Sequence, residues 1–148
     1  MVEALREGFR YDFWANRLWL ECLKGKGEPE PHMSIFQHIL AAQAVWLERC
    51  EGHSPTQMPE PAASLEELER LNQSWLALLD GDPDARIHYR RVNGDAHSLT
   101  LSQIARHVIN HGTYHRGELR GLLRATGDED FPETDLARHA VEMQASVL

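Results

Sequence analysis

Three histidines follow one another at four-residue intervals in the stretch HVINHGTYHRGEL, residues 107–119. Residues four apart lie on the same side of an α-helix, so His107, His111 and His115 would stack along one face. Imidazole is a common metal ligand, and two rings one turn apart can bind the same cation. The spacing therefore indicates either a metal site or a histidine-rich surface helix.

The apolar residues around this stretch predict which way its histidines face. With Ile104 set at zero and about 100° per residue, Leu122 returns to the same angle and marks the centre of an apolar stripe. His111 and His115 then fall within about 20° of that centre, and His107 lies at its edge, near about −60°. We therefore expect His111 and His115 to point into the core, where unpaired imidazoles would be costly.

A metal site needs a third ligand, and His38 is the candidate. It lies among Ile35, Ala42 and Val45 on the predicted core face of an earlier helix, where a leucine would otherwise be expected. Three neutral histidines suit Zn²⁺, Ni²⁺ or Fe²⁺ and leave at least one coordination position open. We expect one divalent ion per chain, most simply zinc. The alternative is that the buried histidines form a metal-free hydrogen-bonded network.

Glu118 lies one turn beyond His115 on the same predicted face and is the candidate catalytic residue. Its carboxylate could act as a general base or could orient a ligand imidazole. Alternatively, it is an exposed acid near the end of the helix that pairs with Arg120 or Arg124.

Other side chains near the histidines have less specific roles. We expect His107, Tyr114 and Trp46 to line the pocket or to support the metal ligands, although aromatic residues at helical spacing usually belong to a core. Arg116 falls about 120° from the centre of the stripe, so we expect it on the surface or in a dimer contact. The remaining histidines are expected on the surface: His32, His53, His88, His97 and His139.

The elements that must position these residues are predicted to be helices. The first covers about residues 3–24 and ends at KGKGEPEP, whose glycines and prolines stop a helix. The second begins near Ser34, a predicted N-cap, with Gln37 as its capping-box partner. Ser64 and Glu67 occupy the same two positions at the start of a third helix, after a proline-rich linker.

A short β-hairpin is predicted between the third and fourth helices. Its tight turn is the Asn93–Gly94 pair, which alternating apolar residues flank. The fourth helix starts at a cap formed by Thr100 or Ser102 and continues to about Ala125, and a short helix follows near the C-terminus. Four amphipathic helices in a chain of this length predict an all-α four-helix bundle.

Composition limits the classes of function. The 148 residues fit a single domain spanning 1–148. The chain has 23 acidic and 15 basic residues and a net charge of −8, which argues against general nucleic-acid binding. No apolar run is long enough to span a membrane, and the charged N-terminal stretch is unlike a signal peptide. Cys22 and Cys50 lack metal-motif spacing, so we expect reduced thiols and a cytoplasmic protein.

Several stretches together resemble the DinB/YfiT-like family of small bacterial four-helix proteins. YDFWANRLWL is similar to the family's first helix, and SIFQHILAAQAVWLERC is similar to its second. VNGDAHSLTLSQIARHVINHGTYHRGEL resembles the hairpin that leads into the last long helix, and GDEDFPETDLARH resembles the usual ending. The histidines before HRGE, at this distance from His38, are the most specific part of the likeness.

The resemblance implies both a fold and a ligand set. It implies an up-down-down-up bundle in which His38, His111 and His115 bind the metal, and it implies a homodimer. Some relatives are metal-dependent thiol transferases or isomerases that use a low-molecular-weight thiol. The chain lacks the additional C-terminal domain of the larger thiol-dependent isomerases, which argues against that particular activity.

Two functions follow as hypotheses. The first is a metal-dependent enzyme whose three-histidine site activates a thiol or water for transfer to, or hydrolysis of, a small molecule. The second is a non-catalytic stress-response or binding protein in which the metal is structural. An open coordination position favours the first, because a structural zinc site normally has four protein ligands.

Overall fold

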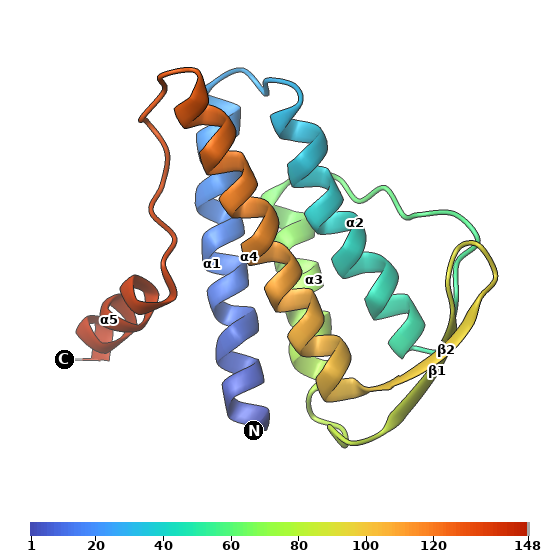
Figure 1. Ribbon diagram of the computed structural model, residues 1–148. Helices are drawn as coiled ribbons and strands as arrows, with labels where there is room; N and C mark the ends of the chain where they lie inside the picture. Colours follow the sequence, from blue (N-terminus) through green and yellow to red (C-terminus); the bar gives the residue numbers. More distant parts are fainter. Residues whose placement is uncertain (148) are drawn as a thin grey trace.

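Four long helices form the body of the molecule, and a hairpin and a short helix are attached to it (Figure 1). The computed structural model describes residues 1–147. In chain order the elements are α1 (Val2–Gly25), α2 (His32–Cys50), α3 (Leu65–Leu78), β1 (Arg86–Arg90), β2 (Ala96–Thr100), α4 (Leu101–Ala125) and α5 (Leu136–Val147). The predicted all-α bundle with a hairpin before the last long helix is confirmed.

The long helices run up, down, down and up (Figure 1). The extended segment 51–64 carries the chain from the end of α2 back to the start of α3, so these two helices are parallel. Helix α4 packs against both α1 and α2, and α1 also packs against α3. This arrangement brings one face of α4 beside α2, from which the predicted third metal ligand must come.

Local capping explains where α3 and α4 begin. The Ser64 hydroxyl accepts a hydrogen bond from the Glu67 backbone N–H at 3.2 Å, as an N-cap does. Thr100 caps α4 in a complete capping box with Gln103. Both predicted caps are confirmed, although the Glu67 carboxylate binds Arg70 instead of returning to the Ser64 backbone.

The predicted start of α2 at Ser34 is wrong. The helix begins two residues earlier, at His32, and Ser34 lies in its first turn. The Glu30 carboxylate accepts hydrogen bonds from both the backbone N–H and the hydroxyl of Ser34. An acid before the helix therefore satisfies its free N–H group and complements the helix dipole.

The hairpin pairs β1 with β2 in antiparallel register from Arg86 opposite Thr100 to Arg90 opposite Ala96. Residues 91–95 connect the strands, and Gly94 has a positive φ of 94°, which favours glycine. The turn is therefore where Asn93–Gly94 predicts it, but it is longer than two residues. The hairpin contacts α2 and α4, so its connecting loop can reach the groove between them.

A hydrophobic core fills the bundle, and a stack of Phe9 on Trp75 with ring centroids 4.8 Å apart lies within it. Its largest fully buried side chains come from all four long helices and the end of α3: Trp19, Trp75, Phe9, Phe36, Leu23, Ile39, Leu40, Leu71, Leu79, Ile104, Leu119 and Val108.

Beside this core lies a buried polar cluster formed by Asp12, Asn16, Gln43 and Arg116. Arg116 Nη1 donates hydrogen bonds to Asp12 Oδ1 at 2.6 Å and to Asn16 Oδ1 at 2.8 Å. Asn16 Nδ2 and Gln43 Nε2 both donate to the other Asp12 oxygen. Arg116 is only 2% exposed, so the expectation of a surface or dimer-contact residue is wrong.

Gly112 makes room for this cluster. A Cβ at this position would lie 2.5 Å from Asp12 Oδ1 and 2.9 Å from Arg116 Nη1, both far below van der Waals contact. The glycine therefore permits the close approach of α1 to α4 that the ion pair requires.

The polar cluster also determines how α4 is rotated about its axis. Its eight buried residues, which include Gly112 and Arg116, centre about 70° from Ile104. The stripe centred on Ile104 and Leu122 is therefore not the centre of the buried face, and Leu122 is only half-buried. The expectation that His111 and His115 point into the core is wrong, because both lie at its edge and are half-buried.

Helix α5 packs against α1. His139 is buried there, with ring centroids 5.8 Å from Tyr11 and 5.2 Å from Trp14, so its predicted surface position is wrong. His53, His88 and His97 are exposed as predicted, and His32 is half-buried. Within residues 1–147 no helix combines the length and apolar character needed to cross a bilayer.

We predict that Gly112→Ala destabilises the fold by about 2 kcal/mol or more, because the new methyl group must displace a buried ion pair. The matched control is Gly117→Ala in the same helix, where a Cβ meets nothing within 4 Å. That change should stabilise the helix by up to about 1 kcal/mol. Urea unfolding of both variants measures the difference, and equal effects would contradict the role given to Gly112.

Candidate metal centre

The three predicted ligands meet in the groove between α2 and α4. His38 comes from α2, where it is exposed and not on the core face as predicted, and His111 and His115 come from successive turns of α4. One nitrogen from each ring lies within 4.8 Å of the others, and His38 Nε2 and His111 Nε2 are 3.1 Å apart. The ring centroids are 4.5–4.8 Å apart in all three pairs. The structure therefore brings together residues 73 positions apart in the chain.

The spacing of the His38 and His111 nitrogens fits binding to one transition-metal ion. Two nitrogens each about 2.0–2.1 Å from zinc at a tetrahedral angle lie about 3.3 Å apart, close to the observed 3.1 Å. Neutral nitrogen donors suit Zn²⁺, Ni²⁺ and Fe²⁺. Within residues 1–147, the three histidines form the group whose donor atoms converge in this way. The described residues thus offer a three-histidine site for a divalent ion.

Two of these imidazoles, His111 and His38, are kept in the form that a metal requires. Burial, followed by the neighbouring His115, His38 and His107 in that order, lowers the pKa of His111 to about 4. Burial also lowers the pKa of His38, followed by the effect of His115, while Glu118 opposes the shift. At neutral pH both rings are uncharged and can donate a lone pair.

Glu118 contacts a metal-ligand candidate directly. Its Oε1 lies 2.9 Å from Nδ1 of His115, which fixes that ring and leaves Nε2 free to face the other histidines. The alternative, in which Glu118 pairs with Arg120 or Arg124, is not seen among the residues that the structure describes. Arg124 pairs with Glu129 at 3.6 Å, and Arg120 lies over the Phe131 ring. The Glu118 side chain is 47% exposed.

The three predicted supporting residues lie in different surroundings. Trp46 and His107 pack against each other with centroids 5.5 Å apart, and both line a cavity beside the metal-ligand candidates. The His107 ring is 5.7 Å from that of His111 but does not join the converging donor atoms. Tyr114 is 74% exposed and does not line this cavity, although its ring packs against His115 at 5.0 Å.

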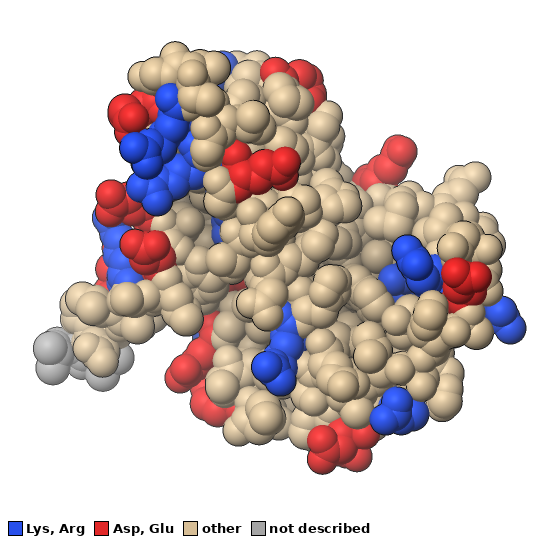
Figure 2. All heavy atoms as spheres, in the orientation of Figure 1, with Lys and Arg blue, Asp and Glu red and all other residues tan. Residues whose placement is uncertain are grey.

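The cavity beside the histidines has a volume of about 480 Å³. Metal-ligand candidates His38 and His111 form one side, and residues from α2, the 51–64 segment and the hairpin turn form the rest. Figure 2 shows that the surface over α2 and α4 carries few charged groups, while Lys and Arg atoms lie near the hairpin. A small molecule in this cavity would contact the three-histidine site.

Arg49 is a cavity residue that sequence reasoning missed. It follows His38, Ala42 and Val45 along one face of α2 at helical spacing, and all four line the cavity. The same periodicity that singled out His38 could have found Arg49 one turn further on, at the end of the helix. A basic residue in the last turn is, however, common for its effect on the helix dipole, so it did not stand out.

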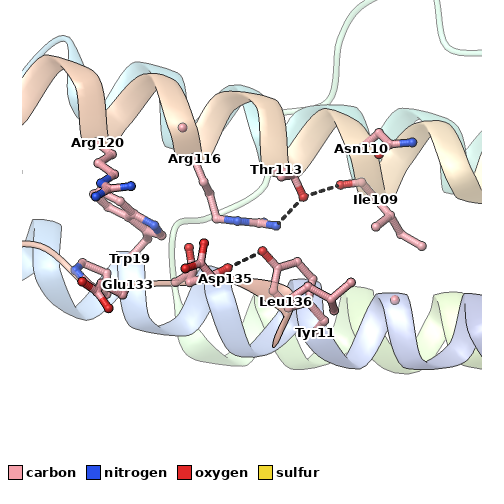
Figure 3. A pocket seen from close by; sticks show the side chains of 14 residues that line it. Tyr11, Trp19, Ile109, Asn110, Thr113, Arg116, Arg120, Glu133, Asp135 and Leu136 are labelled. Carbon is pink, nitrogen blue, oxygen red and sulfur yellow. Dashed lines mark hydrogen bonds between the residues drawn. The ribbon is translucent and has the colours of Figure 1, made fainter. Parts of the chain in front are cut away.

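A second cavity lies on the other side of α4 and has a different character. It is about 400 Å³ and lies between α1, α4 and residues 132–136. Figure 3 shows Arg116 and Arg120 on α4 facing Glu133, Asp135 and Leu136 across it. None of the three metal-ligand candidates lines this cavity, so we place the functional site in the groove between α2 and α4.

The cysteines do not offer a reactive thiolate. Burial, followed by the adjacent Glu51, raises the pKa of Cys50 to about 12. Burial also raises the pKa of Cys22, and both thiols are free. These shifts argue against a protein thiolate as the nucleophile at this centre.

Comparison with known proteins places this histidine arrangement in a family. Residues 27–144, which include all three histidines, match the model of the DinB family. The chain belongs to the DinB family. It is also similar to Protein DinB of Bacillus subtilis (strain 168), with 25% identity over 149 aligned positions that cover 84% of this chain and 87% of the relative. DinB membership and the three-histidine cluster together fit a metal-binding protein.

We predict that His111→Ala weakens Zn²⁺ binding at least about 100-fold, because it removes a donor at the centre of the cluster. His107→Ala is the matched control on the same face of α4 and should change the affinity by less than about tenfold. Isothermal titration of untagged protein measures both affinities. Equal losses in the two variants, or no loss in either, would contradict the ligand assignment.

Proposed function

We propose that this DinB-family protein is a metal-dependent enzyme in which His38, His111 and His115 bind one divalent ion, with zinc first and nickel or iron next. The reaction is the activation of a thiol or water for transfer to, or hydrolysis of, a small molecule. The observation that carries the proposal is the cavity of about 480 Å³ in direct contact with two of the three histidines. A purely structural zinc site would instead have four protein ligands.

A divalent ion in this site would lower the pKa of water or of a bound low-molecular-weight thiol toward neutrality. The protein's own residues prepare the surroundings. The Glu118 carboxylate holds the His115 ring in one orientation through a 2.9 Å contact with Nδ1. We therefore assign Glu118 the role of orienting a ligand, with proton transfer at its exposed side as the second possibility.

The cavity walls favour an organic substrate. Val45 and Trp46 line it from α2, and Met58 and Val92 line it from the two loops that face α2. Apolar walls give the hydrocarbon part of a substrate a surface to pack against. Trp46 is itself held by edge contacts with Tyr89 at 4.9 Å and with His107 at 5.5 Å, so its ring is a fixed surface for a substrate to contact.

The test is turnover by zinc-loaded protein with a thiol plus an electrophile (glutathione with 1-chloro-2,4-dinitrobenzene) and with a hydrolysable ester (4-nitrophenyl acetate). We expect activity with one of them that EDTA abolishes, that added Zn²⁺ restores, and that His38→Ala removes. His53→Ala, an exposed histidine beside Glu48, is the control and should keep full activity. Tight zinc binding without metal-dependent turnover of either kind would favour the structural-metal alternative.

We further propose that the chain is a cytoplasmic homodimer whose partner is a small molecule and not a nucleic acid. The exposed apolar side chains Leu136, Val141 and Met143 on α5 support a subunit contact there. The net charge of −8 disfavours binding to phosphate backbones. Light scattering of the purified protein tests the dimer, and a monomeric mass at micromolar concentration would contradict it.

A further inference from the structure

Two arginines without acidic partners line the cavity at the end away from the histidines. Arg49 comes from the last turn of α2, and Arg91 comes from the hairpin connection. Neither side chain takes part in any ion pair or side-chain hydrogen bond found among residues 1–147. A cavity with metal ligands at one end and free guanidinium groups at the other can recognise two parts of one molecule.

Arg49 is buried although it is charged. It is 7% exposed, and its Nε is buried with no hydrogen-bond partner. Its guanidinium carbon lies 4.5 Å from the Trp46 ring centroid and 5.2 Å from that of Tyr89, so two aromatic rings fix its position. A buried guanidinium without a hydrogen-bonded anion is unfavourable, and a rigidly held one is prepared to bind an anion.

No neighbouring carboxylate neutralises the charge of Arg49 among the described residues. Burial lowers its pKa, and nearby Arg91 lowers it further, while Tyr89 has the opposite effect. Among the nearby carboxylates, Glu48 pairs with His53, Asp95 accepts a hydrogen bond from Asn93 at 3.0 Å, and Glu51 makes no ion pair with either arginine within residues 1–147. The two arginines therefore create positive potential in an otherwise apolar cavity.

Apart from His107 and Asn93, the residues that line the cavity between the arginines and the metal-ligand candidates are apolar. Ala42 and Val45 on α2, with Met58 and Val92 opposite, line the path from His38 to Arg49. The two helix positions are eleven residues apart, about 16 Å along the axis, and a helical arginine side chain leans back toward the N-terminus of its helix. A ligand that touches both ends must therefore have a hydrocarbon body several atoms long.

We propose that Arg49, assisted by Arg91, binds the carboxylate of a small organic acid whose apolar or aromatic body extends toward the three histidines. One buried guanidinium matches one negative charge, and its planar fork binds a carboxylate through two hydrogen bonds. The inference rests on the proposed function in placing the reacting end of the substrate at the metal, but the carboxylate site itself does not require the reaction.

The test compares 4-phenylbutanoate with its neutral amide, 4-phenylbutanamide, by isothermal titration of the full-length protein. Each compound is titrated into protein carrying one equivalent of Zn²⁺ and into protein treated with EDTA. We expect the acid to bind about 10- to 100-fold more tightly than the amide in both preparations, as expected for hydrogen bonds to a charged group. A wild-type protein that shows no preference for the acid overturns the proposal without any variant.

The variants separate Arg49 from the metal. In Arg49→Met the preference for the acid should disappear in both preparations, and in Arg49→Lys it should be reduced but retained. Arg90→Met is the matched control, since Arg90 is exposed, binds the Gly94 carbonyl and does not line the cavity. A preference that survives Arg49→Met and vanishes with EDTA would show that the carboxylate binds the metal, which overturns the assignment.

The outcomes for the two proposals are distinct. A carboxylate preference that depends on Arg49, in a protein without metal-dependent turnover, supports the anion site and contradicts the enzymatic proposal. Metal-dependent turnover with no preference for the acid supports the enzymatic proposal and contradicts the anion site. If Arg49→Met does not fold, the wild-type comparison and Arg49→Lys still decide the question.

Discussion

The buried ion pair between Asp12 and Arg116 fixes the geometry on which the rest of the structure depends. The two groups are 2.6 Å apart and almost fully buried, and Asn16 and Gln43 complete the hydrogen bonding of the carboxylate. A buried pair of this kind contributes little net stability, but its partners tolerate few alternative positions. It therefore joins α1 to α4 in one register and one rotation.

That rotation places the histidines. Gly112 and Arg116, which face α1, each follow a metal-ligand candidate by one residue, so His111 and His115 must face about 100° away. This direction leads to the groove beside α2, where His38 Nε2 lies 3.1 Å from His111 Nε2. The same helix thus presents a buried ion pair on one side and three converging imidazoles on the other. The residues that pack α4 against α1 are therefore the immediate neighbours of the residues that could bind a metal.

Much of the fold and the ligand trio could be predicted from the sequence, and the error in the depth of the histidines has one physical cause. Helical periodicity and capping residues located the four long helices, the hairpin and the caps at Ser64 and Thr100. The periodicity also paired His38 with His111 and His115, but it placed them too deep. Counting apolar residues treats arginine and glycine as surface residues, whereas Gly112 lies near the centre of the buried face of α4 and Arg116 belongs to the same face.

Long-range contacts account for the remaining errors. The position of Arg116 depends on Asp12 and Asn16, about a hundred residues earlier, and no local pattern reveals that partnership. His139 is likewise buried only because Tyr11 and Trp14 lie beside it in space. Arg49 became visible as a functional candidate once the cavity joined it to the histidines. Sequence periodicity predicts which residues share one face of a helix, and the tertiary structure determines which residues contact that face.

The cavity gives the site a direction, from neutral imidazoles at one end to free guanidinium groups at the other. The measurement that tests this account most directly is a crystal structure of zinc-soaked protein with anomalous data collected at the zinc absorption edge. We predict one anomalous peak within about 2.0–2.2 Å of a nitrogen from each of His38, His111 and His115, with its open side toward the cavity. A peak elsewhere, or a fourth protein ligand closing the site, would contradict the account.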